Sequence, residues 1–223
     1  MKQSLYIDIY FDFICPWCWI GKRNLEPALA SLKASHPQVE VIRQWHGVQL
    51  LPDLPLAGIP YKEFYLRRLG SEAAIRQRQA QVQEAARYAG LALALAGIPR
   101  MPNTGEAHRL FRACSQLQSE PKQLDALLEK LFALHFIQYN DLSDTDLLLA
   151  IAGECGFDAG AVADRLANPG THRSPNHRVA ASVPSFVFNA GFDFHQNRLI
   201  SGAQPPNVLH QAMVQAVAGE VRA

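Results

Sequence analysis

An alternating apolar pattern that runs directly into a pair of cysteines is the feature that most constrains this chain. From Leu5 to Phe13, apolar side chains occupy every second position, which is the period of a β-strand with one buried face. From Ile20 to Leu32, leucines recur at helical spacing. Cys15 therefore lies where a strand ends and a helix begins. Pro16 suits the first helical turn because it lacks an N–H group that the helix could not use there.

The segment Cys15-Pro16-Trp17-Cys18 predicts thiol chemistry at this helix start. The attacking species in thiol–disulfide exchange is the thiolate. A helix N-terminus favours an anionic sulfur through its unpaired N–H groups and the positive end of its dipole. Cys18 follows three residues later on the same helix face, so it can reach Cys15 and close a disulfide. We predict that Cys15 is the nucleophile and that Cys18 is the resolving thiol.

Other uses of a Cys-x-x-Cys pair fit this sequence less well. Zinc would need a second cysteine pair or two histidines at ligand spacing, whereas Cys114 and Cys155 are single residues. His172 and His177 stand five residues apart around a proline, which is not the spacing of a helical ligand pair. We therefore expect no metal. Two inert core cysteines are the other alternative, and for Cys114 and Cys155, which lie on apolar helix faces, we expect buried, inert thiols.

With its flanking residues, the segment from Asp12 to Gly21 resembles the active site of the DsbA-like thioredoxin superfamily. It is most similar to the FrnE-like branch, which is related to 2-hydroxychromene-2-carboxylate isomerases and kappa-class glutathione transferases. The resemblance continues in order through residues 101–110, 183–188 and 200–205. It implies an α/β, thioredoxin-like fold, in which a central mixed sheet with flanking helices is interrupted by an all-helical insertion domain.

The periodicity along the chain fits this division. A second strand over 39–45 follows the first helix, and strand, helix, strand opens a thioredoxin-like unit with parallel pairing. After a proline-rich connection, helices are predicted over 71–95, 104–117, 124–136, 144–155 and 158–166. Strands over 185–189 and 198–201 should form an antiparallel hairpin before a closing helix over 205–217. We expect the thioredoxin-like domain at 1–57 and 169–223, and the helical insertion at 58–168.

Three helix ends in the insertion are expected from capping signals in the sequence. Thr104 is a plausible N-cap, because a hydroxyl there could accept a hydrogen bond from a backbone N–H of the first turn. Asp144 or Ser143 should cap a later helix in the same way. Gly156 should stop that helix, because glycine readily adopts the left-handed conformation that ends many helices.

The resemblance implies further site residues away from the cysteines. The Val183–Pro184 bond would be cis and would face the Cys-x-x-Cys pair, so that the Val183 backbone could pair with an extended peptide or with glutathione. Asn103 and His108 match a motif of the helical domain that lies near the active-site cleft in this family. The alternative for this pair is a helix cap plus a surface histidine.

For the residues beside the cysteines, a role in the reaction has to be weighed against a purely structural role. Trp17 is expected to offer an apolar contact to the substrate, whereas Trp19, at helical spacing, belongs to the core. Asp12 is expected to cap the loop or the following helix rather than to move a proton, because a nearby carboxylate raises a thiol pKa. Pro16 is expected to support the helix start.

Composition limits the partners that we expect. The 223 residues carry a formal net charge of +1, which gives no electrostatic case for nucleic acid or a membrane surface. The sequence has no run of about 18 apolar residues that could span a membrane. Asp8 and Asp12 interrupt what would be the apolar part of a signal peptide. We therefore expect a cytoplasmic protein, whose cysteine pair rests mostly as a dithiol.

The predicted function is that of a DsbA-like protein disulfide oxidoreductase. Its Cys15–Cys18 pair would exchange with the disulfide of a protein or of a small-molecule thiol, without any metal or organic cofactor but with glutathione as a candidate co-substrate. The alternative is a glutathione-dependent isomerase or transferase; those relatives generally carry serine where Cys15 stands. A peptide-holding chaperone is a third option. The direction of electron flow, the natural substrate, the redox potential and the oligomeric state stay open.

Overall fold

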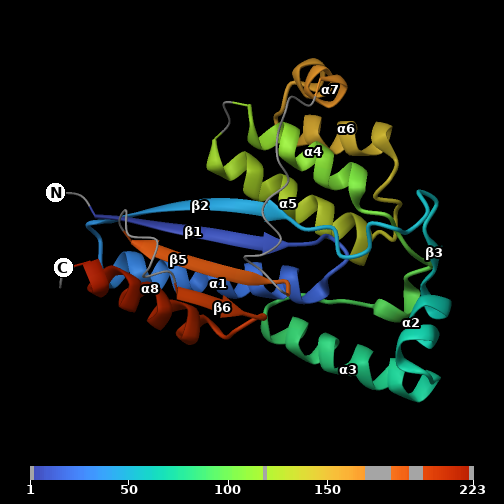
Figure 1. Ribbon diagram of the computed structural model, residues 1–223, viewed down its shortest axis with the longest axis horizontal. Helices are drawn as coiled ribbons and strands as arrows, with labels where there is room; N and C mark the ends of the chain where they lie inside the picture. The colour runs from blue at the N-terminus through green and yellow to red at the C-terminus, as the bar shows by residue number, and fades with distance from the viewer. Residues whose placement is uncertain (1–2, 118–119, 169–181, 191–197, 221–223) are drawn as a thin grey trace. The chain divides into compact units, whose positions relative to one another are not determined.

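The computed structural model describes residues 3–117, 120–168, 182–190 and 198–220 (Figure 1). The chain divides into two compact units: Met1–Val48 together with Pro175–Ala223, and Gln49–Ser174 between them in the sequence. The first unit contains the sheet, and the second is mainly helical. The domain boundaries predicted after residues 57 and 168 fall near these divisions and stay predictions. The segment from 169 to 181, which includes His172 and His177, lies outside the described residues.

A four-stranded mixed sheet in the order β2-β1-β5-β6 organises the first unit. Strand β1 (Gln3–Phe11) runs parallel to β2 (Val39–Gly47), which confirms the predicted parallel pairing. Strand β5 (Ser185–Ala190) is antiparallel both to β1 and to β6 (Arg198–Ser201), so the predicted antiparallel pair is also confirmed. β1 ends at Phe11, two residues earlier than the alternation predicts, because the chain turns there toward the first helix.

Helices α1 (Pro16–Ser35) and α8 (Pro206–Glu220) cover one face of this sheet (Figure 1). The apolar positions of β1 and β5 point toward the two helices, and this explains the alternating sequence pattern. Burying a large apolar side chain completely contributes about 1.5–3 kcal/mol to folding. The shared core consists of Leu5, Ile7, Ile9, Leu25, Ala28, Leu32, Phe186, Phe188, Leu209, Ala212, Met213 and Val217.

The second unit is built from six helices and one short strand pair among the described residues. Helix α4 packs against α5, α6 and α7, while α2 packs against α3 and the strand pair. A short 3₁₀ turn, η1 (Leu95–Gly97), precedes strand β4. The elements are β3 (Ile59–Pro60), α2 (Tyr61–Leu69), α3 (Glu72–Tyr88), β4 (Arg100–Met101), α4 (Gly105–Ser115), α5 (Pro121–Phe136), α6 (Thr145–Glu154) and α7 (Ala159–Ala167).

Two helix ends in this unit differ from the sequence prediction. Helix α3 was expected to reach residue 95 but ends at Tyr88, because Gly90 adopts a left-handed φ of +73° that a continuing helix cannot use. Helix α5 begins at Pro121, three residues earlier than predicted. Glu120 and Gln123 form a reciprocal capping box there, with each side chain bonding the other's backbone N–H.

The ends predicted for α6 are confirmed. The Asp144 side chain accepts a hydrogen bond from the Leu147 N–H at 3.1 Å. Gly156 follows the helix with a φ of +85°, which glycine adopts without the steric cost that a Cβ would bring. Local signals of this kind are readable from sequence because the cap and the group that it satisfies are separated by only three residues.

Gly21 marks the closest approach between α1 and the sheet. A Cβ at this position would lie 3.1 Å from Cζ of Phe186 and 3.2 Å from Cγ of Pro184. These distances are shorter than ordinary carbon–carbon contacts of about 3.5–4.0 Å. The absence of a side chain at Gly21 therefore lets the helix that carries both cysteines lie directly against Pro184 and the start of β5.

We expect Gly21→Val to lower the free energy of unfolding by about 1–3 kcal/mol, because its γ-methyl groups would overpack this contact. Gly153→Val in α6 is the matched control, since a Cβ there meets no atom within 4 Å. It should stay within about 0.5 kcal/mol of the wild type. Urea unfolding followed by circular dichroism measures both, and equal stability of the two variants would contradict the close contact at Gly21.

Candidate active site

The structure places the two cysteines at the start of α1, as predicted. Cys15 is the N-cap residue, with Pro16 as the first helical residue, and the Cys15 N–H donates to the carbonyl of Asp12 at 3.1 Å. The Cys15 side chain makes no capping hydrogen bond, so its sulfur is not engaged with the first-turn N–H groups. The Cys18 N–H donates to the Cys15 carbonyl at 2.9 Å, which places Cys18 within the first turn behind it.

Cys18 is the more deeply buried of the two thiols. Its side chain is 2% exposed, against 7% for Cys15. Burial raises the pKa of Cys18 well above its usual value, and the neighbouring Cys15 thiol and the Asp12 carboxylate add to the rise. The Cys18 thiol therefore stays protonated, as suits a resolving group that acts only after Cys15 has reacted. Asp12 is itself fully buried, beside this pair.

The second half of the sheet unit brings Val183 and Pro184 to the cysteines. The Val183–Pro184 peptide bond is cis. The Cys15 thiol donates to the Val183 carbonyl, with Sγ and O 3.7 Å apart, although 168 residues separate the two in the sequence. The Pro184 carbonyl in turn accepts from the Gly202 N–H at 2.8 Å, which fixes this segment to the chain after β6. The backbone of Val183 thus lies beside the nucleophilic sulfur.

Tyr10 is a site residue that the sequence analysis missed. It is 8% exposed and forms a small cluster with Val187 on the sheet face opposite the main core, and Val48 and Val183 pack against this cluster. The Tyr10 ring stacks on His46, with centroids 4.9 Å apart, and His46 Nε2 lies 2.6 Å from Oδ1 of Asp8. Burial, followed by the Asp8 charge, raises the pKa of Tyr10. The alternation assigned Tyr10 to the polar face of β1, and only the long-range packing reveals that it shares a cluster with Val187 and Val183.

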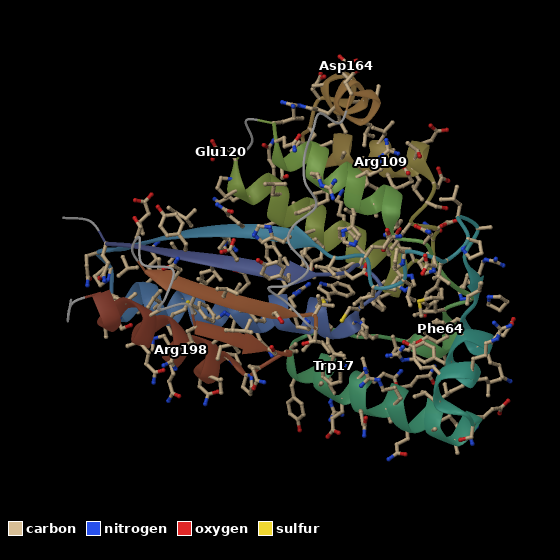
Figure 2. The ribbon with its side chains drawn as sticks, viewed as in Figure 1. Trp17, Phe64, Arg109, Glu120, Asp164 and Arg198 are labelled. Carbon is tan, nitrogen blue, oxygen red and sulfur yellow. The ribbon has the colours of Figure 1, made fainter. Side chains whose placement is uncertain are left out.

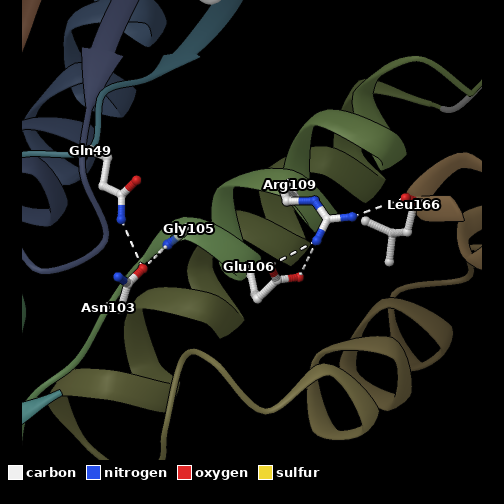
Figure 3. A network of polar contacts seen from close by, with 6 residues as sticks. All are labelled: Gln49, Asn103, Gly105, Glu106, Arg109 and Leu166. Atoms are coloured by element: carbon white, nitrogen blue, oxygen red, sulfur yellow. Dashed lines mark hydrogen bonds and ion pairs between the residues drawn. The ribbon is translucent and has the colours of Figure 1, made fainter. Parts of the chain in front are cut away.

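Asn103 is held by three hydrogen bonds inside the helical unit, and Figure 3 shows the two that its Oδ1 accepts. Its amide Nδ2 donates to the Leu54 carbonyl at 2.6 Å, and its Oδ1 accepts from Gln49 Nε2 and from the Gly105 N–H, both at 2.8 Å. The Asn103 side chain therefore satisfies the first N–H of α4. The predicted N-cap position of Thr104 is confirmed, but the hydrogen bond expected from its hydroxyl to the first turn is not formed.

His108 is buried rather than on the surface, with 6% of its side chain exposed. The alternative reading of this residue as a surface histidine is therefore wrong. His108 lies in the first turns of α4, close in sequence to the Asn103 cap. A role for Asn103 and His108 in substrate binding stays a prediction.

The remaining tryptophans and cysteines are placed as follows. Trp17 is half-buried in the first turn of α1 (Figure 2), and its contact with substrate stays a prediction. Trp19 is buried, which confirms its place in the core. Cys114 is buried as predicted, and burial raises its pKa to about 12. Cys155 is only half-buried, contrary to expectation, because it follows the last turn of α6 rather than lying on its packed face.

Two negative observations apply to the described part of the chain. Those residues contain no group of three or more His, Cys, Asp or Glu side chains that could hold a metal ion. Within the same ranges, every helix is too short or too polar to cross a membrane.

A mixed four-stranded sheet with a Cys-x-x-Cys pair at its first helix, interrupted by a helical insertion, defines a thioredoxin-like protein of the DsbA type. Residues 6–214 match the DSBA-like thioredoxin domain, so the chain belongs to this family and the predicted fold is confirmed. A probable DsbA oxidoreductase from Streptomyces coelicolor is 26% identical with a TM-score of 0.77, and the match covers 96% of this chain and 90% of that one.

Two further solved structures share the fold. A 2-hydroxychromene-2-carboxylate isomerase is 15% identical with a TM-score of 0.63, and the cytosolic disulfide reductase DsbM from Pseudomonas aeruginosa is 16% identical with a TM-score of 0.58. Each match covers 97% of this chain and 98% of the other. No curated protein sequence matches the chain. The FrnE-like branch is not singled out by these similarities.

The burial difference predicts different reactivities for the two active-site thiols. Iodoacetamide should label Cys15 at least about tenfold faster than Cys18 at near-neutral pH, because a raised pKa leaves Cys18 little thiolate. In Cys15→Ser, labelling of Cys18 should become appreciable only above about pH 8.5, the usual thiol pKa. Peptide mass spectrometry measures both rates. Cys114 is the internal control and should react only in urea, and equal rates at Cys15 and Cys18 would contradict the assignment.

The Asn103 bonds predict a stability effect. We expect Asn103→Asp to lower the free energy of unfolding by about 1–3 kcal/mol, because it removes the donor to Leu54 and places a carboxylate oxygen against that carbonyl. Thr104→Val is the matched control, since the Thr104 hydroxyl makes no hydrogen bond to lose. Urea unfolding measures the change. An Asn103→Asp variant that unfolds like the wild type but has a higher KM would instead assign Asn103 to the substrate.

Proposed function

We propose that this protein catalyses thiol–disulfide exchange through Cys15 and Cys18 on disulfides of proteins or small thiols. The observation that carries the proposal is the contact of the Cys15 thiol with the Val183 carbonyl at 3.7 Å, with a buried second thiol one helical turn behind. This arrangement combines a nucleophile, a resolving thiol and a backbone edge for substrate within a few ångströms. The DSBA-like family membership supports the same reaction class.

The exchange proceeds in two displacements. The Cys15 thiolate attacks one sulfur of the substrate disulfide, the substrate S–S bond breaks, and the other sulfur leaves as a thiolate that takes up a proton. Cys18 then loses its proton and attacks Cys15 of the mixed disulfide, which releases the second substrate thiol. The substrate gains two electrons and the enzyme is left with a Cys15–Cys18 disulfide. The reverse sequence oxidises a dithiol with the same residues.

The surroundings of the cysteines suit these two steps. Cys15 lies at the N-terminus of α1, beside the Val183 carbonyl, where its sulfur can meet a substrate disulfide. Burial and the nearby Asp12 carboxylate keep Cys18 protonated until the mixed disulfide has formed. A peptide or glutathione that pairs with the Val183 backbone would present its sulfur beside Cys15, and Trp17 would offer an apolar contact.

Finer assignments rest on the sequence resemblance. The order of the motifs favours the FrnE-like branch over other DsbA-like proteins. A cytoplasmic location stays a prediction; there the pair would rest mainly as a dithiol and the enzyme would act as a reductant. The presence of both cysteines favours this function over a glutathione-dependent isomerase or transferase, which would activate glutathione's thiol instead of its own.

Replacement of each cysteine tests the mechanism. Cys18→Ser should accumulate a mixed disulfide through Cys15, because the resolving attack is lost. Cys15→Ser should lower the rate of disulfide reduction at least about a hundredfold, because a hydroxyl is a far weaker nucleophile than a thiolate. Reduction of oxidised glutathione and of a disulfide-containing peptide measures the rates, and mass spectrometry identifies the trapped adduct.

Cys155→Ser is the matched control, since this half-buried thiol lies at the end of α6 and has no part in the proposed steps. Its activity should equal that of the wild type. Full reductase activity in Cys15→Ser would overturn the mechanism. Isomerase activity that appears in Cys15→Ser on addition of glutathione would favour the glutathione-dependent alternative.

A further inference from the structure

Helices α4 and α7 of the helical unit form a small groove that is rich in arginine. The groove encloses about 20 Å³, and Figure 2 marks its two helices by Arg109 and Asp164. Three of its positions lie on one face of α4, where residues three or four apart are side by side, and a fourth is the C-cap residue of that helix. The lining consists of Arg109, Arg112, Ala113, Gln116, Arg165 and Leu166.

Arg109 is fully engaged in holding the two helices together (Figure 3). Its Nη1 donates to both carboxylate oxygens of Glu106 at 2.8 Å, and its Nη2 donates to the Leu166 carbonyl at 2.9 Å. Glu106 and Arg109 therefore neutralise each other. They form a fixed wall of the groove and leave the carboxylate of Glu106 unavailable to the other arginines.

Arg112 and Arg165 are charged groups that the described residues do not neutralise with a carboxylate. Each lies in the last turn of its helix, where the dipole favours a cation. Each of the two helix C-termini contributes about −0.5 elementary charge, and each of the two guanidinium groups contributes one positive charge. The net charge in the groove is therefore about +1. Asp164 is adjacent to Arg165 in sequence, but successive residues of a helix do not face each other.

We propose that this groove is a binding site for a small phosphate-type oxyanion. Arg112 and Arg165 approach from different helices, and the Gln116 amide adds a third donor one turn from Arg112. Three donors that line one groove from two helices suit a tetrahedral anion with three or four oxygens better than a planar carboxylate with two. A cavity needs about 10–15 Å³ to hold one water, so this groove seats one oxygen of the anion and leaves the others at its mouth.

An NMR titration of the full-length protein with inorganic phosphate tests the site, with sodium chloride holding the ionic strength constant. We expect saturable amide shifts confined to the last turns of α4 and α7. The double variant Arg112→Gln/Arg165→Gln should weaken phosphate binding at least about tenfold, because two charge-assisted donors are lost. The matched control, Arg68→Gln/Arg76→Gln, removes the same charge from α2 and α3 and should bind phosphate within about twofold of the wild type.

Several outcomes would overturn the proposal. Amide shifts that grow linearly with phosphate concentration would show only a general attraction of phosphate to the positive side chains. Equal phosphate affinity in the two double variants would show the same. Acetate that binds as tightly as phosphate would rule out the tetrahedral selectivity. The single variant Arg165→Gln, at an exposed position, repeats the test if the double variant does not fold. The proposed site uses none of the residues assigned to thiol–disulfide exchange, so none of these outcomes bears on the exchange chemistry.

Discussion

The close packing of α1 against the start of β5 is the constraint on which the active site depends. Gly21 has no side chain, so Phe186 and Pro184 lie against the helix at distances that a Cβ would make too short. The same contact brings the Val183 carbonyl to 3.7 Å from the Cys15 sulfur. The nucleophile and the backbone edge proposed for substrate come from opposite ends of the chain. Their distance is therefore set by core packing rather than by any local motif.

The two active-site cysteines, Cys15 and Cys18, have identical side chains but different surroundings. Cys15 occupies the N-cap, beside the Val183 carbonyl. Cys18, one turn later, is enclosed by the helix, and burial together with Asp12 raises its pKa. A protonated, shielded second thiol does not compete with the first for substrate. The order of the two displacements thus follows from depth of burial along a single helical turn.

Much of this could be predicted from the sequence because the deciding signals are local. The alternation before Cys15 and the helical spacing after Pro16 fix a strand–helix junction at the cysteines. Asp144 caps α6 and Gly156 ends it through groups only a few residues away. The family match over residues 6–214 agrees with the motifs that sequence reasoning used. Strands, helices and caps depend on the period of the apolar side chains and on short-range hydrogen bonds. Both signals come from residues that are close together in the sequence, so both can be predicted from it.

The sequence by itself determined where the strands and helices run and which two thiols stand at a helix start. Only the tertiary structure decided which residues surround them. Tyr10 looked like a polar-face residue, yet it shares a cluster with Val187 and Val183, because β1 and β5 are neighbours in the sheet. Thr104 is the N-cap of α4, but the Asn103 amide, and not the Thr104 hydroxyl, accepts from the first N–H of the helix. Leu54 and Gln49, about fifty residues away in the sequence, hold that amide in place. Such contacts depend on how segments that are distant in the sequence pack together, and local sequence patterns do not predict this packing.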